Sequence, residues 1–283
     1  MPIATLIAAG RLDDRLAAAA CARFGARRGA WVEEGSALDV HFDGAVPLGE
    51  GWEGVDLIAI TPGPRRRKLL VADMDSTMIG QECIDELADY AGVKPQVAAI
   101  TERAMRGELD FAAALRERVA LLADLDESVL ATCLAERVRP NPGAATLVRT
   151  MGHFSATCLL VSGGFTAFVE PVARMIGFHE FRANVLASRD GRLTGDTNGV
   201  VVDAVAKQAA LEEARDRLGL ASDETMAIGD GANDRAMIEA AGWGIAFRAK
   251  PALAAVADAR LDHHGLDALL WAQGIPRAEW LEA

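Results

Sequence analysis

Three short segments without polar side chains, each followed directly by residues capable of chemistry, constrain the fold of this 283-residue chain most. They occupy residues 69–72, 159–161 and 226–228. A strand that is apolar throughout is buried on both faces, which is typical of a parallel sheet covered by helices. Helical patterns alternate with these strands, over 144–151, 166–176, 204–218 and 234–241. We therefore predict an α/β fold, a doubly wound parallel sheet whose ligands bind beyond the carboxyl ends of the strands.

A long stretch with only helical patterns separates the first of these strands from the second. Helices are predicted there over 82–90, 95–106, 111–123 and 127–137. The region before the first strand has an α+β pattern, with strands expected at 3–9, 30–33, 37–42 and 55–60 and a helix at 13–24. The predicted division is a small N-terminal α+β domain (1–66), a catalytic α/β core (67–80 and 138–283) and a helical cap (81–137) inserted after the first strand.

Two further segments carry local signals. The turn sequences Asp190-Gly191 and Asn198-Gly199 predict one or two hairpins within 183–203. The basic run from Arg65 to Lys68 follows the turn sequence Thr61-Pro-Gly-Pro64. Such a run beside a turn predicts a solvated hinge rather than a nucleic-acid contact.

The charge balance limits the partners of the chain. Acidic residues number 41 and basic residues 29, which gives a net charge of −12. This field repels nucleic acid and anionic membranes, so neither is an expected partner, and an anionic substrate requires a local cation. The four cysteines show no CxxC spacing, which indicates reduced thiols and a cytoplasmic location. The longest stretch without charge, 150–169, is too polar to predict a membrane span.

Carboxylates follow two of the apolar strands. Asp73 and Asp75 come directly after the first strand and lie on one side of an extended chain. Asp230 and Asp234 follow the strand at 226–228, within the sequence Gly-Asp-Gly-Ala-Asn-Asp. Taken alone, each pair also fits a capped turn. Carboxylates from two strand ends together suit a hard cation such as Mg²⁺ that also meets a substrate phosphate.

Anion-binding groups follow the remaining strand. Ser162-Gly163-Gly164 precedes a predicted helix, so its hydroxyl and amides form a cradle for an anion, although the same sequence also fits a plain tight turn. Lys207 lies on the helix predicted at 204–218. It is either a surface lysine or, if it points toward the same strand ends, the local cation that this acidic chain needs.

In this order, these motifs resemble the signature motifs of the haloacid-dehalogenase superfamily. Further stretches resemble the phosphoserine phosphatase family within it: Glu82-Cys-Ile-Asp-Glu86, the run from Thr101 to Phe111, Leu115-Arg-Glu-Arg-Val119, Ala183-Asn184, Leu193-Thr-Gly195 and Ala249-Lys-Pro251. The resemblance covers residues 69 to about 265. It implies hydrolysis of O-phosphoserine, a small-molecule substrate, to serine and phosphate, as the last step of serine biosynthesis.

The resemblance also implies roles for residues. Asp73 is the nucleophile and Asp75 the general acid and base. Mg²⁺ is held by the Asp73 carboxylate, the Asp75 carbonyl and Asp230, with Asp234 in support. The residues expected to bind the substrate are Ser162, Gly163, Lys207 and Asn233 on the core, and Glu82, Met105, Phe111 and Arg118 on the cap. Among the cap residues, Glu82 is assigned to the ammonium of the substrate and Arg118 to its carboxylate.

Alternatives remain open at this point. Another small phosphomonoester is a second substrate class, with either water or an amino alcohol as acceptor. A phospho-aspartate receiver also uses acids at strand ends, a lysine and Mg²⁺, but it lacks a cap insertion. The sequence is compatible with a homodimer. Related enzymes carry amino-acid-sensing domains of the βαββαβ kind in front of the core, and residues 1–66 are short for a complete one.

Overall fold

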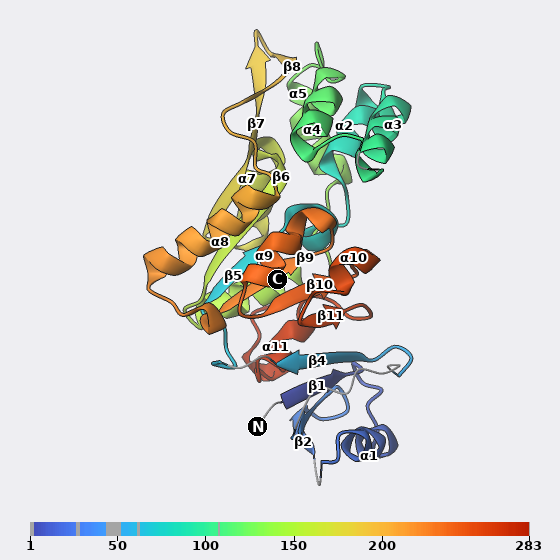
Figure 1. The fold of residues 1–283 in the computed structure, drawn as a ribbon, viewed down its shortest axis with the longest axis vertical. Helices are drawn as coiled ribbons and strands as arrows, with labels where there is room; N and C mark the ends of the chain where they lie inside the picture. The colour runs from blue at the N-terminus through green and yellow to red at the C-terminus, as the bar shows by residue number, and fades with distance from the viewer. Residues whose placement is uncertain (1–2, 27–28, 44–51, 61–62, 107, 283) are drawn as a thin grey trace.

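The computed structural model describes residues 3–26, 29–43, 52–60, 63–106 and 108–282. Two sheets organise this part of the chain (Figure 1). The larger has seven strands in the order β11-β10-β9-β5-β6-β7-β8. Their bounds are β5 Leu69–Ala72, β6 Thr157–Phe165, β7 Glu180–Arg189, β8 Arg192–Asn198, β9 Thr225–Gly229, β10 Gly244–Phe247 and β11 Ala259–Leu261. Every neighbouring pair is parallel except β7 and β8. This confirms the predicted doubly wound α/β fold.

Helices cover both faces of this sheet. The apolar side chains of β5 alternate between two clusters, because successive residues of a strand point to opposite faces. Leu70 and Ala72 belong to the cluster that includes α6 (Ala144–His153), α7 (Thr166–Ile176) and α11 (Ala268–Ala272). Leu69 and Val71 belong to the other, with α8 (Ala204–Leu218), α9 (Arg235–Ala240) and α10 (Pro251–Ala254). The strands are therefore held rigidly between two apolar layers.

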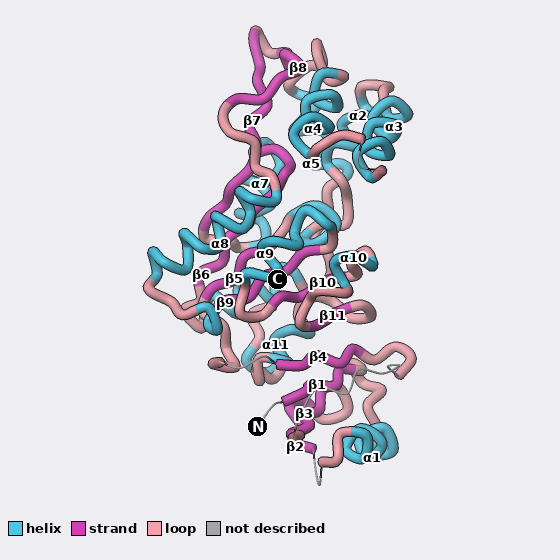
Figure 2. Tube along the Cα trace, viewed as in Figure 1, coloured by secondary structure: helices cyan, strands magenta, loops and turns pink. Residues whose placement is uncertain are grey.

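A helical cap stands over one end of the sheet (Figure 2). It consists of α2 (Cys83–Tyr90), α3 (Lys94–Met105), α4 (Phe111–Ala120) and α5 (Ser128–Arg137). The hairpin of β7 and β8 extends from the sheet to the far end of the cap, where the Asp124 amide donates to the Leu193 carbonyl at 2.9 Å. Only the turn at Asp190-Gly191 joins two strands, so the segment holds one hairpin. Helix α4 ends at Ala120, three residues earlier than expected.

The second sheet is antiparallel and lies in the N-terminal segment, in the order β2-β3-β1-β4. Its elements are β1 Ile3–Ile7, α1 Asp14–Arg23, β2 Gly29–Glu33, β3 Ala37–His41 and β4 Asp56–Ile60. One face packs against α1 through Ala4 and Leu6. The opposite face, with Ile7 and Ile58, joins the main hydrophobic cluster of the core. The middle strands β1 and β3 are thus buried on both sides.

The expectation of a solvated hinge at the basic run is wrong for two of its members. Arg67 is buried and stacks over the Trp243 ring, with its guanidinium carbon 5.3 Å from the ring centre. Arg65 is ion-paired with the buried Asp39 at 2.6 Å. Arg65 joins β3 to the core, because it also donates to the Ala272 carbonyl of α11 at 3.0 Å, whereas Arg67 packs within the core. Among the described helices, none is long and apolar enough to cross a bilayer.

Candidate active site

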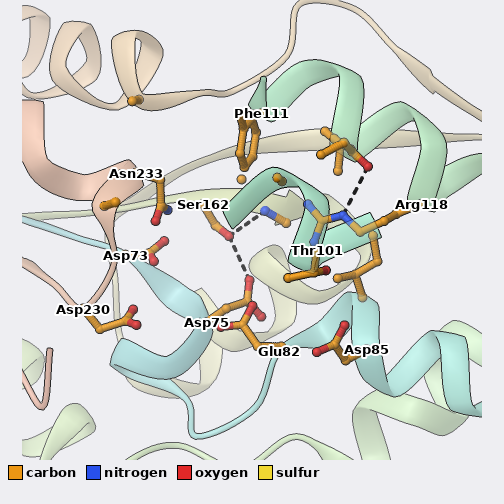
Figure 3. Close-up of a pocket in the computed structure, with 18 of the residues that line it drawn as sticks. Asp73, Asp75, Glu82, Asp85, Thr101, Phe111, Arg118, Ser162, Asp230 and Asn233 are labelled. Carbon is orange, nitrogen blue, oxygen red and sulfur yellow. Dashed lines mark hydrogen bonds between the residues drawn. The ribbon is translucent and has the colours of Figure 1, made fainter. Parts of the chain in front are cut away.

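Strand register brings the polar residues together. Ala72, the last residue of β5, pairs with Leu160 of β6 and with Ile228 of β9. Because these strands are parallel, Asp73, Ser162 and Asp230 emerge at the same edge of the sheet (Figure 3). In open α/β sheets, ligands bind at this edge, beyond the carboxyl ends of the strands.

Lys207 joins this edge from helix α8. Its ammonium nitrogen lies 2.6 Å from Asp73 Oδ1 and 2.6 Å from Asp234 Oδ1. The side chain is only 1% exposed, so Lys207 is not a surface lysine. Burial alone would lower its pKa, but the charges of Asp234 and Asp73 outweigh this and raise it. The structure therefore holds a fixed positive charge at the edge of the sheet.

Three carboxylates gather beside this ammonium. One oxygen each of Asp73, Asp230 and Asp234 lie within 4.8 Å of one another. Burial, and then the charge of Asp234, raises the pKa of Asp230 to about 6 and that of Asp73 well above its ordinary value. Crowded carboxylates of this kind, with only oxygen donors, fit a hard divalent cation such as Mg²⁺.

The contacts of two of these carboxylates differ. Asp234 uses Oδ1 for Lys207 and Oδ2 for the amides of Asp230 and Gly231, at 3.2 and 3.1 Å. Asp230 accepts one bond from the Thr77 hydroxyl, at 3.1 Å. Asp230 therefore retains free acceptor capacity, whereas both oxygens of Asp234 are engaged.

Asp75 lies two residues beyond Asp73, at the boundary between core and cap. Its Oδ1 accepts from the Cys83 amide at 2.9 Å, and its Oδ2 accepts from the Ser162 hydroxyl at 3.3 Å. Burial and then the charge of Glu82 raise the pKa of Asp75 to about 6, against the opposing effect of the Cys83 amide. A carboxyl with this pKa changes protonation state readily near neutral pH, as a general acid and base must.

The residues predicted to form the anion cradle, Ser162 to Gly164, lie at the end of strand β6, which continues to Phe165. Close packing explains both glycines. A Cβ on Gly163 would lie 2.7 Å from Phe111 Cζ, and one on Gly164 would lie 2.9 Å from Asp75 Oδ2. The Gly164 amide donates to Ser162 Oγ at 2.8 Å. Only glycine fits at these two positions, because Phe111 and Asp75 occupy the space that a Cβ would need.

A cavity of about 940 Å³ separates the edge of the sheet from the cap. Among the residues predicted to form the site, those that line it are Asp73, Asp75, Glu82, Phe111, Arg118, Ser162, Gly163, Asp230 and Asn233. Lys207 and Asp234 lie behind this wall, in contact with Asp73 or Asp230. The side chain of Met105 lies outside the described residues, so its assignment stays a prediction.

The cap supplies charges of both signs to the cavity. Glu82 is exposed and accepts a bond from the Ser76 hydroxyl at 2.7 Å. The pKa of Arg118 is lowered by burial, against the opposing charges of Asp85, Glu82 and Asp75. Its Nε donates to the Ala114 carbonyl at 3.2 Å, and it forms no ion pair with a described residue. Arg118 points into the cavity beside Thr101 (Figure 3). An unpaired, partly buried guanidinium is suited to bind a carboxylate.

Sequence reasoning missed several contributors. Thr77 holds Asp230, and Asp85 and Lys250 line the cavity. The buried Asn184 donates to the Gly163 carbonyl at 2.8 Å and accepts from the Val202 amide at 2.8 Å. Thr77 and Asn184 stand within stretches that carried the family resemblance, which was the available signal. Their roles depend on partners far away in the sequence, so no local pattern assigns them.

The chain is similar in sequence to proteins of one known family. Residues 70–239 match the model of the haloacid dehalogenase-like hydrolase family. A phosphoserine phosphatase of Mycobacterium tuberculosis is 47% identical over 215 residues, which cover 76% of this chain and 52% of that protein. The chain thus matches about half the length of this curated relative.

Two solved structures are similar in fold. A haloacid-dehalogenase-family hydrolase from Salmonella enterica serovar Typhi has a TM-score of 0.86 at 27% identity. The aligned residues cover 96% of this chain and 98% of that hydrolase. A phosphoserine phosphatase with an analogue of a phospho-aspartyl intermediate has a TM-score of 0.68 at 38% identity. The aligned residues cover 73% of this chain and 98% of that phosphatase. Together with the matched family model, these findings show that the chain belongs to the haloacid dehalogenase-like hydrolase family.

Proposed function

We propose that this chain is a phosphoserine phosphatase, which hydrolyses O-phosphoserine to serine and phosphate through a phosphorylated Asp73. The observation that carries the proposal is the buried Lys207 ammonium, 2.6 Å from Asp73, at a strand end that opens into a cavity with charges of both signs. The names of the relatives support the substrate, and the phospho-aspartyl analogue in one related structure supports the intermediate.

The first half of the reaction transfers the phosphoryl group to the enzyme. Lys207 holds Asp73 Oδ1, which leaves Oδ2 to attack the phosphorus atom. The bond between phosphorus and the serine oxygen breaks, and protonated Asp75 gives its proton to that oxygen. Ser162, the Gly163 amide and Lys207 stabilise the charge that spreads over the phosphoryl oxygens.

The second half returns the enzyme to its starting state. Asp75, now ionised, takes a proton from a water molecule, and the water oxygen attacks the phosphorus atom. The bond from phosphorus to Asp73 breaks and phosphate leaves, with the proton back on Asp75. Its pKa of about 6 suits both directions.

Mg²⁺ is the proposed cofactor. Asp73, Asp230 and the Asp75 carbonyl would hold it, with Asp234 in support. When bound, the cation neutralises the repulsion between carboxylates and phosphate. The free acceptor capacity of Asp230 and the fully engaged oxygens of Asp234 support this division of roles.

The cap selects the substrate in this proposal. Glu82 binds the ammonium of phosphoserine, and Arg118 binds its carboxylate. Phe111 and Met105 form apolar walls that exclude water, and Asn233 contacts the substrate from the core. The domain division given above, a cytoplasmic location and a homodimer stay predictions.

Phosphate release from phosphoserine tests the function directly. The native chain with Mg²⁺ should turn over many times, whereas Asp73→Asn should lose at least about 1,000-fold in kcat because the nucleophile is gone. Chelation of Mg²⁺ should cause a similar loss. A native chain that is phosphorylated once and retains the group would instead identify a phospho-aspartate receiver.

Cap variants separate phosphoserine from other phosphomonoesters. Glu82→Gln and Arg118→Met should each raise KM for phosphoserine about 10-fold or more and leave hydrolysis of an aryl phosphate intact. Equal losses on both substrates would favour a different small phosphomonoester. A phosphate ester of an added amino alcohol, formed in place of free phosphate, would indicate a phosphotransferase.

A further inference from the structure

Two linkers join the cap to the core, residues 78–82 and 138–142, and they run side by side. Ile79 and Pro140 form an antiparallel bridge. The Gly80 amide donates to the Arg139 carbonyl at 3.3 Å, and the Arg139 amide donates to the Gln81 side-chain oxygen at 2.9 Å. The first linker runs directly into Glu82 and helix α2. Its conformation therefore determines where Glu82 stands.

One side chain, that of Asn141, joins these linkers most extensively. Its Nδ2 donates to the Thr77 carbonyl at 2.7 Å and to the Ile79 carbonyl at 3.1 Å. Its main-chain amide donates to the carbonyl between them, that of Met78, at 2.9 Å. A single residue thus satisfies three consecutive carbonyls, those of residues 77–79, where the chain enters the first linker. Its own carbonyl accepts from the Ala144 amide at the start of α6, at 3.1 Å, so it is also fixed to the core.

The cap has a second attachment, at its opposite end. The Leu193 amide of the β7–β8 hairpin donates to the Leu125 carbonyl, and the Glu127 amide donates to the Gly191 carbonyl, both at 2.9 Å. This attachment holds the end of the cap that is remote from Glu82. The position of Glu82 relative to Asp75 consequently depends on the near attachment, where Asn141 lies.

We propose that Asn141 is a positioning residue for substrate recognition, which fixes the first linker to the core and thereby holds Glu82 in place to bind the substrate ammonium. This inference rests on the proposed function. Asn141 does not line the cavity. Its effect passes through the linker to Glu82, whose carboxylate is also held by the Ser76 hydroxyl of the same loop.

The test compares phosphoserine with 3-phosphooxypropanoate, which is phosphoserine without its ammonium group. Asn141→Ala removes both side-chain hydrogen bonds and should lower the preference for phosphoserine, in kcat/KM, about 10-fold, mainly through KM. Asn141→Thr restores one donor and should recover part of the preference. Asn198→Ala, at an exposed position at the end of β8, is the matched control and should change nothing.

A double-mutant cycle identifies the residue through which Asn141 acts. In a Glu82→Gln background, Asn141→Ala should cause no further loss of preference, because the group that it positions is already disabled. An equal loss on both substrates, or a full additional loss in this background, would overturn the inference. The first outcome would assign the effect to Thr77 and Asp230 instead.

Hydrogen exchange keeps this test separate from the proposed function. Asn141→Ala should speed exchange of the Gly80 and Arg139 amides by at least about 10-fold while the exchange of β5 is unchanged. Unchanged exchange at both linker amides would show that Asn141 does not fix the linkers. This measurement needs no turnover, so a native chain without activity on phosphoserine would refute the function and leave the attachment itself testable.

Discussion

The Lys207 ammonium stands where solvent barely reaches, between two carboxylates that are themselves almost fully buried. Burying an isolated charge is costly, and the arrangement persists because each charge offsets the desolvation of its neighbour. In the proposed mechanism the same geometry serves the chemistry, since a cation already held in place needs no reorganisation when charge develops on a phosphoryl group. Stability and the proposed catalysis therefore depend on one side chain.

Replacing this lysine should affect stability in a way that depends on pH. Lys207→Met leaves Asp73 and Asp234 buried side by side without compensation, at a cost of about 3 kcal/mol in the free energy of unfolding near pH 8. Uncompensated burial raises the pKa of a carboxyl in the folded state above its unfolded value. Such a group destabilises the fold increasingly as pH rises from the unfolded pKa to the folded one. The loss in the free energy of unfolding caused by Lys207→Met should therefore be smaller at pH 5 than at pH 8.

Urea unfolding with a chelator present, at pH 5 and pH 8, measures this deficit. Lys94→Met, an exposed lysine at the start of α3, is the control and should stay within about 0.5 kcal/mol of the native chain. A deficit for Lys207→Met that is equal at the two pH values would contradict the argument from buried carboxylates.

At the scale of elements, the strand ends were predictable and the contacts between distant segments were not. Strands β5, β6 and β9 are apolar because both faces are covered, so their sequences alone located the edge of the sheet that forms the candidate site. The short elements β11 and α10 hold three and four residues, too few to show a period, and were not predicted. The burial of Arg67 depends on Trp243 and Asp223, far along the chain, so local composition suggested a solvated run instead.

The contact between Gly163 of β6 and Phe111, the first residue of α4 in the cap, leads to a prediction. Gly163→Ala places a Cβ 2.7 Å from Phe111 Cζ, so the Phe111 ring must shift, together with the start of α4 where it cannot shift alone. Overpacking of this kind costs about 1 to 3 kcal/mol of stability. Because it also displaces this part of the cap from the edge of the sheet, kcat/KM for phosphoserine should fall by about 10-fold or more. In a Phe111→Ala background the same glycine substitution should cost much less, because the obstructing ring is gone. Steady-state kinetics on the four chains would reveal the coupling, and additive losses would contradict it.

At the scale of the whole molecule, the N-terminal sheet is attached to the core by buried polar contacts as well as by apolar packing. Asp56, at the start of β4, accepts from the amides of Asp262, His263 and His264 and contacts the His264 ring at 2.7 Å. Asp39 of β3 accepts from Arg65 and from the Thr5 hydroxyl, both at 2.7 Å. These contacts lie at the opposite end of the core from the cap (Figure 1). The N-terminal sheet is thus integrated into the core at a distance from the active site.

This attachment predicts an acid-sensitive contribution to stability that leaves catalysis alone. Burial by itself would raise the pKa of Asp56, but the hydrogen bonds from His264 and from the Asp262 and His263 amides lower it below the ordinary value of 3.8. A carboxyl with a depressed pKa stabilises the fold above its unfolded pKa, and this contribution is lost as pH falls through the folded pKa. Asp56→Asn cannot accept the same set of bonds and should cost about 2 kcal/mol between pH 5 and 8. The difference between native and variant should then shrink below about pH 3.8, with kcat/KM unchanged at neutral pH. Denaturant unfolding across this range measures the difference. A difference that widens on acidification would mean that Asp56 is held in its protonated form and would contradict the prediction.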